Sequence, residues 1–291
     1  MVEKDFQDNF YKSLKVNKDI AFGYQKERRL QIINYIERKL NFNFKKKNIK
    51  IAEFGCGTGY FSAYILRKFQ NIKLDLYDIS SSLNPVIDEV MAISNVSKDR
   101  YNFYSCDINK DLIKKKYDIV FMCGALHHSY NLKKYFNAIK KSLNSNGLLI
   151  CQEPAFKEDI NLEDLKKYYI KRLNITFNKN MPQYERYDTF FKVSEYLVAS
   201  RYSSFDLLEL RKWDHFMNHP ELYVGEKYEK NQFLKLLVYA AKYLRNKYRN
   251  IILQESTSRN KNINNYLFIF KNISEINNDN WLPHLDLLGL N

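Results

Sequence analysis

The sequence predicts an α/β protein with a doubly wound, mostly parallel seven-stranded sheet that carries helices on both faces. A glycine-rich loop, Gly55–Gly59, joins a short apolar strand to a helix. Five apolar strand candidates alternate with helical segments between residues 48 and 152, which is typical of parallel sheets. Acidic residues follow two of these strands, at Asp78 and Asp107.

The expected elements follow one another regularly along the chain. A first helix, Ile20–Leu40, carries apolar residues at helical spacing, such as Ile33, Ile36 and Leu40. We expect further helices at Tyr60–Phe69, Pro85–Ile93, Leu132–Leu143 and Glu226–Asn246. The expected strands are Asn48–Phe54, Ile72–Tyr77, Tyr101–Cys106, Asp118–Met122, Leu148–Gln152, Asn250–Gln254 and Asn265–Phe270.

The alternation stops after Pro154. The segment from 155 to about 224 is rich in Tyr and Phe and contains no convincing strand candidate. A helical insertion of about seventy residues is too long for an ordinary connection, so we expect a substrate lid. The predicted domains are an N-terminal helical cap (1–48), a ligand-binding core (49–154), the lid (155–224), and a segment that completes the core with a helix, two strands and an apolar tail (225–291).

Charge and composition narrow the class of protein. The net charge of +14 raises the question of a nucleic-acid partner, but the lysines are scattered, with short runs only at Lys45–Lys47 and Lys114–Lys116. A nucleic-acid partner is therefore not favoured, and an anionic small molecule suits the same charge. The four cysteines form no Cys-x-x-Cys pair, and no zinc or redox site is expected.

The expected location of the protein in the cell follows from two features that the sequence lacks, a membrane span and a secretory signal. No stretch of 18 apolar residues exists, so we expect no membrane span. The start of the chain, Met1–Phe10, mixes charged residues and has no apolar segment of the kind found in a secretory signal. These features predict a cytoplasmic protein.

The glycine loop is the most informative string in the chain. Gly55 permits a sharp turn, and Gly57 allows a ligand to approach the backbone at a helix N-terminus. Tyr60 stands where a dinucleotide-binding fingerprint requires its third glycine. Glu53, two positions before the loop, suits a cationic amino-acid head group better than a pyrophosphate.

Between residues 49 and 154 the chain resembles the class I S-adenosylmethionine-dependent methyltransferases, which have a Rossmann-like fold. Glu53–Gly59 is similar to their first motif and Leu76–Ser80 to their second, in which an acidic residue binds the ribose hydroxyls. Ser105–Ile108 resembles the third motif, and Tyr117–His128 the fourth strand with the Leu-His-His that often follows it. The resemblance implies S-adenosyl-L-methionine as cofactor, held by Glu53, Gly55, Gly57, Gly59, Asp78, Ile79, Asp107, Ile108 and Cys123.

Methyl transfer to an alcohol benefits from a general base near the carboxyl ends of the strands. The candidates are His128 after the fourth strand, Glu153 at the end of the fifth, and His215 in the expected lid. The neighbouring His127 is interpreted as a hydrogen-bonded structural imidazole. No metal site is expected, because the region after the fourth strand lacks clustered carboxylates.

Three functions remain open at this point. The favoured one is O-methylation of a small molecule, with a sugar or nucleotide-linked sugar as the expected substrate, because a single long insertion can close over a modest substrate. The second is methylation of RNA (tRNA) or protein, which only the net charge of +14 supports. The third is a non-catalytic, cofactor-binding partner subunit, against which the intact glycine loop and both acids argue.

Overall fold

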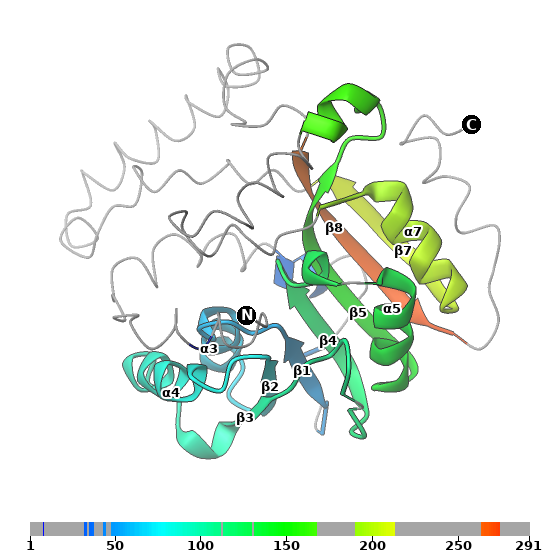
Figure 1. Cartoon of the computed structure of the whole chain (residues 1–291). Helices are drawn as coiled ribbons and strands as arrows, with labels where there is room; N and C mark the ends of the chain where they lie inside the picture. Colours follow the sequence, from blue (N-terminus) through cyan, green and yellow to red (C-terminus); the bar gives the residue numbers. More distant parts are fainter. Residues whose placement is uncertain are drawn as a thin grey trace, which may run out of the picture.

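One mixed β-sheet organises the described part of the chain (Figure 1). The computed structural model describes residues 8, 32–33, 35–37, 43–44, 48–111, 113–129, 131–167, 190–212 and 263–273. The strands are β1 (Ile51–Phe54), β2 (Leu74–Asp78), β3 (Tyr101–Ser105), β4 (Tyr117–Cys123), β5 (Leu143–Phe156), β6 (Phe191–Lys192), β7 (Phe205–Lys212) and β8 (Ile263–Asn272).

The strand order is β3-β2-β1-β4-β5-β8-β7, with β6 paired to β5 off this path. The pairs among β1 to β6 are parallel, whereas β8 runs antiparallel to both β5 and β7. The order reverses at β1, between β2 and β4, which is where open α/β sheets bind ligands. The doubly wound, mostly parallel sheet is therefore confirmed. Within the described residues it has eight strands, of which β6 and β7 were not expected, whereas the expected strand Asn250–Gln254 lies outside these residues.

Helices cover the two faces of this sheet (Figure 1). The face that carries α3 (Tyr60–Lys68) and α4 (Leu83–Ile93) contains one apolar cluster, which Ile32, Ile33 and Ile36 join. The opposite face carries α5 (Leu132–Lys141) and α7 (Val193–Tyr202) over the second cluster. Both faces bury apolar side chains, so the central strands consist of nearly continuous apolar residues.

The local elements of the core agree with the sequence pattern. The first five expected strands are confirmed, and the helices α3, α4 and α5 lie within about two residues of their expected bounds. The expected first helix is described only at residues 32–33 and 35–37, which are helical. The expected strand Asn265–Phe270 lies inside β8. The expected helix Glu226–Asn246, the expected strand Asn250–Gln254 and the apolar tail are outside the described residues.

The expectation of a strandless segment from 155 to 224 is wrong. This segment contains β6 and β7, and β7 is a full strand of the sheet. A register shift between Leu207 and Glu209 interrupts the pairing of β7 with β8. Such a bulge breaks the alternation of apolar and polar residues, so Leu207, Leu208 and Leu210 show spacing that also fits a helix. Residues 168–189 and 213–224 of the expected lid lie outside the described residues.

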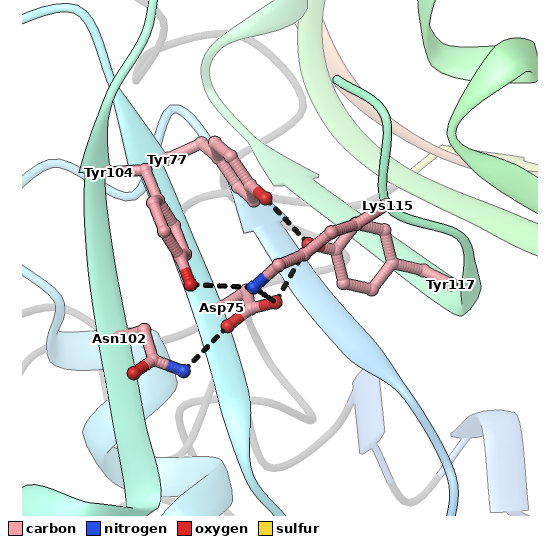
Figure 2. A network of polar contacts seen from close by, with 6 residues as sticks. All are labelled: Asp75, Tyr77, Asn102, Tyr104, Lys115 and Tyr117. Atoms are coloured by element: carbon pink, nitrogen blue, oxygen red, sulfur yellow. Dashed lines mark hydrogen bonds and ion pairs between the residues drawn. The ribbon is translucent and has the colours of Figure 1, made fainter.

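A network of polar side chains lies over β2 and β3 (Figure 2). It is on the face of the sheet that carries α5, because Tyr77 and Tyr117 belong to the apolar cluster on that face. The described residues between β3 and β4, 106–111 and 113–116, contain no helix. In its place the Asp75 carboxylate accepts hydrogen bonds from Tyr117 Oη at 2.8 Å, Lys115 Nζ at 3.0 Å and Asn102 Nδ2 at 2.9 Å. One carboxylate thus links β2 to β3, to β4 and to the segment before β4.

Tyrosine rings complete this network. Tyr77 stacks on Tyr104 with ring centroids 5.0 Å apart, and its hydroxyl lies 2.6 Å from that of Tyr117. Lys115 Nζ lies 4.5 Å from the centroid of the Tyr104 ring and 2.6 Å from its hydroxyl oxygen. Burial raises the pKa of Tyr117, as do its hydrogen bonds to Tyr77 and Asp75, so this phenol stays protonated and can donate.

We predict that Asp75→Ala lowers the free energy of unfolding by about 1–3 kcal/mol, because Tyr117 and Lys115 lose a charged acceptor. Urea denaturation measures the change. Asp99→Ala is the matched control, because its partner Lys73 is 4.0 Å away and both side chains are largely exposed. Equal midpoints for Asp75→Ala and the control would contradict a structural role for the network.

Candidate functional site

The candidate site lies where the parallel strands end. In the register of the sheet, Glu53 of β1 is opposite Leu76 of β2 and Phe121 of β4. The residues that follow these strands, together with Glu153 of β5, therefore meet at one edge. This is the edge at which open α/β sheets bind their ligands.

The glycine loop after β1 is held against β2 and β4. The backbone N–H groups of Gly55 and Cys56 both donate to the Tyr77 carbonyl, at 2.8 and 3.0 Å. Gly55 has φ +70°, and a Cβ there would lie 2.3 Å from Cβ of Ala125 in the segment after β4. Glycine is needed at this position both for the backbone conformation and for this close approach.

Asp78 at the end of β2 binds the same loop. Its Oδ2 accepts the N–H of Gly57 at 2.9 Å, and its Oδ1 accepts the N–H of Ser80 at 3.2 Å. Burial raises the pKa of Asp78, while hydrogen bonds from the backbone of Gly57, Ser80 and Ile79 act in the opposite direction. The structure therefore places the predicted ribose-binding acid directly beside the glycine loop.

The other predicted cofactor residues lie around these two. Glu53 is buried and accepts a hydrogen bond from Ser62 Oγ, so its carboxylate lies against α3, the helix that follows the loop. Gly59, with φ +77°, is the N-cap of α3. The Ile79 carbonyl accepts Ser105 Oγ at 3.2 Å. Half-buried Cys123 ends β4 opposite Gln152 of β5.

Asp107 and Ile108 follow β3 at the same edge. The N–H of Cys106 donates to the Asp78 carbonyl at 2.7 Å, which fixes the end of β3 beside that of β2. Asp107 Oδ2 pairs with Lys110 Nζ at 2.9 Å, and its Oδ1 accepts the N–H of Asn109 at 3.0 Å. Ile108 is buried in the cluster on the α5 face.

Glu153 organises the segment after β4. Its side chain is fully buried, and Oε1 accepts the N–H groups of Ala125 at 2.9 Å and Leu126 at 2.8 Å. Its Oε2 lies 2.8 Å from Nδ1 of His127. An ionised carboxylate can only accept a hydrogen bond, so Nδ1 of His127 is assigned as the donor in this pair.

His127 contacts two of the three candidate bases, Glu153 and His128. His128 lies in the short 3-10 helix η2 (Leu126–His128), with its ring centroid 4.2 Å from that of His127. His215 lies outside the described residues. The ring of Phe190 meets His127 edge-on at 5.5 Å. His127 is hydrogen-bonded as expected, but its partner went unforeseen because Glu153 of β5 lies 26 residues further along the chain than His127 of η2.

Within the described residues, no group of three His, Cys, Asp or Glu side chains is arranged to hold a metal ion. In the same part of the chain, no helix combines the length and the apolar character needed to cross a membrane.

The strand order, the glycine loop, Asp78 at the end of β2 and Asp107 after β3 are those of a class I, Rossmann-like methyltransferase fold. Comparison with known proteins agrees with this. Residues 52–149 match the family described as a methyltransferase domain. An O-methyltransferase of a trans-AT polyketide synthase from Brevibacillus brevis, solved with S-adenosyl-L-homocysteine, aligns with a TM-score of 0.54 at 18% identity. The alignment covers 86% of this chain and 73% of that one.

A phosphoethanolamine N-methyltransferase 2 from Haemonchus contortus, solved with S-adenosyl-L-methionine, aligns with a TM-score of 0.58 at 14% identity, covering 92% of this chain and 60% of that one. Among sequence relatives, malonyl-[acyl-carrier protein] O-methyltransferase 2 of Ilyobacter polytropus is 36% identical over 34% of this chain and 37% of its own length. The enzyme of that name from Calditerrivibrio nitroreducens is 24% identical over 79% of this chain and 82% of its own. The chain thus spans well under half of the first of these relatives.

We predict that Gly55→Ala lowers the free energy of unfolding by about 2–4 kcal/mol, because it combines a left-handed backbone with a clash against Ala125. Thermal and urea denaturation measure the loss. In the double variant Gly55→Ala/Ala125→Gly the clash is removed, so part of the stability should return. Strictly additive effects in this cycle would show that the two loops do not touch.

Proposed function

We propose that the protein binds S-adenosyl-L-methionine at this edge and transfers its methyl group to an oxygen of a small acyl acceptor. The contact between Asp78 and the glycine loop is the observation that carries the proposal. A carboxylate at this place can accept hydrogen bonds from two adjacent ribose hydroxyls. The turn at Gly55 and Gly57, both with positive φ, brings backbone rather than side chain next to that carboxylate.

The residues present fit this cofactor. When bound, S-adenosylmethionine supplies an electrophilic methyl group on a sulfonium sulfur. Asp78 would hold the ribose and Asp107 the adenine amino group, with Ile108 beside the ring. Glu53 and Asp78 place negative charge near the glycine loop, which favours a cationic ligand. The role of the protein would be to align the acceptor oxygen with the methyl carbon and the sulfur, since such alignment is the main requirement of an in-line displacement.

His127 and Glu153 form the proposed catalytic pair. Glu153 fixes the imidazole through Nδ1 and stabilises the cation that forms when Nε2 takes a proton. A carboxylate acceptor is already ionised at neutral pH and needs no base, whereas a hydroxyl does. A buried histidine held by a buried carboxylate therefore favours a hydroxyl on the acyl acceptor.

The acceptor class rests on the relatives. Their names refer to malonyl groups on an acyl-carrier protein and to a polyketide synthase, which share an acyl chain borne by a carrier. The aromatic edge of Phe190 against His127 suits an apolar acceptor. The sugar or nucleotide-linked sugar expected from the sequence draws no support from these relatives, and neither does RNA.

We predict binding of S-adenosylhomocysteine at low micromolar affinity, about −7 to −8 kcal/mol, measured by calorimetry. Asp78→Ala should weaken this binding by about 1.5–3 kcal/mol, the usual cost of lost hydrogen bonds to a charged group.

Cofactor binding should also depend on pH. Protonation of the Asp78 carboxylate removes a hydrogen-bond acceptor, so the wild-type affinity for S-adenosylhomocysteine should fall as the pH drops through the raised pKa of Asp78. Asp78→Asn should bind weakly at neutral pH and lack this dependence; an unchanged pH profile in Asp78→Asn would contradict the assignment.

We predict that His127→Ala lowers kcat by about a hundredfold to ten-thousandfold on a 3-hydroxyacyl thioester while cofactor affinity stays near wild type. Glu153→Gln should lower kcat in the same direction, because the amide reverses the tautomer of His127. The matched control is His128→Ala, measured by release of S-adenosylhomocysteine. A loss confined to His128→Ala would transfer the role of base to that residue.

The same assay separates the acceptor classes. Malonyl thioesters turned over equally by wild type and His127→Ala would indicate methylation of a carboxylate. Turnover of nucleotide-linked sugars or tRNA, with no turnover of acyl thioesters, would overturn the acyl proposal. Cofactor binding without turnover of any of these would favour a non-catalytic cofactor-binding subunit.

A further inference from the structure

A carboxylate from the beginning of the chain lies against the loop that follows Asp78. Asp8 Oδ1 accepts a hydrogen bond from Ser80 Oγ at 2.6 Å and from the N–H of Ser82 at 3.1 Å, with Ser81 Oγ at 3.5 Å. Ser80 is fully buried. More than seventy residues of chain separate the partners, so these contacts tie Asp8 to the β2–α4 loop from a distant part of the sequence.

Asp8 occupies the position of a missing helix cap. Ser82 is the N-cap residue of α4, but its side chain makes no capping hydrogen bond, and the first turn of α4 contains no acidic residue. The N-terminus of a helix leaves N–H groups without partners and favours negative charge. Asp8 supplies both an acceptor for the N–H of Ser82 and that charge.

Ser80 connects Asp8 to the proposed cofactor site. It donates its hydroxyl to Oδ1 of Asp8 and its N–H to Oδ1 of Asp78. Asp78 in turn accepts the N–H of Gly57. A continuous hydrogen-bonded path therefore runs from Asp8 through one buried serine to the proposed ribose-binding carboxylate and the glycine loop.

We propose that Asp8 is a positioning residue for the cofactor, which holds the β2–α4 loop so that Asp78 is oriented for the ribose. This inference rests on the proposed function, because it concerns the same ligand. Asp8 does not touch the ligand itself; it fixes Ser80, and Ser80 fixes Asp78. The negative charge of Asp8 adds to burial in raising the pKa of Asp78, which agrees with their proximity.

The test compares Asp8→Ala with Asp88→Ala in the full chain. Asp88 also stabilises α4, since it accepts Tyr101 Oη at 2.8 Å and pairs with Lys98. Neither of these two contacts leads to Asp78. Calorimetry with S-adenosylhomocysteine should show a Kd about threefold to tenfold higher in Asp8→Ala, the size of one lost hydrogen bond. Asp88→Ala should bind within twofold of wild type, although both variants melt at a lower temperature.

A double-mutant cycle tests the path. Ser80→Ala removes the hydroxyl, so adding Asp8→Ala to it should weaken binding less than Asp8→Ala does alone. Hydrogen exchange of the ligand-free protein is an independent readout: the amide of Ser82 should exchange faster in Asp8→Ala, and not in Asp88→Ala.

The results distinguish a failure of the proposed function from a failure of the inference about Asp8. If wild type fails to bind S-adenosylhomocysteine, the proposed function falls, and this inference with it. If wild type binds and Asp8→Ala binds as tightly as Asp88→Ala, Asp8 has no positioning role while the proposed function stands. Unchanged exchange at Ser82 in Asp8→Ala would show that the contact itself is absent in solution.

Discussion

The site depends on one close contact, that between the turn after β1 and the segment after β4. No Cβ fits at Gly55, because Ala125 occupies the space at 2.3 Å. The loop that faces the proposed cofactor and the segment that carries His127 are therefore fixed against each other. Glu153 of the neighbouring strand β5 also holds the segment that carries His127, because its carboxylate accepts backbone N–H groups of that segment. A methyl donor and a base held on the two loops would share one rigid frame.

Much of this arrangement could be predicted from the sequence, because the information is local. The alternation of apolar strands and helices around the glycine loop gives the core of the fold, and Asp78 and Asp107 follow their strands as expected. Their place beside the glycine loop follows from the parallel order of the strands. The resemblance of this region to methyltransferases added roles that spacing alone does not give.

The rest depends on contacts between distant residues. β7 escaped prediction because a bulge disturbs the periodicity that identifies a strand. The hydrogen bond expected of His127 is present, but its partner, Glu153 of β5, could not be named from the sequence because it lies 26 residues further along the chain. The position of Asp8 carries no local signal, since its partners lie more than seventy residues further along the chain.

The network around Asp75 has a consequence for how this edge of the sheet responds to temperature and salt. A covering helix would bury apolar side chains, whose exposure on unfolding raises the heat capacity. Here hydrogen bonds, a lysine and stacked rings close part of that face (Figure 2). Polar surface contributes to heat capacity with the opposite sign. The stability of β2 and β3 should therefore vary gently with temperature, and more with ionic strength because Lys115 is half exposed.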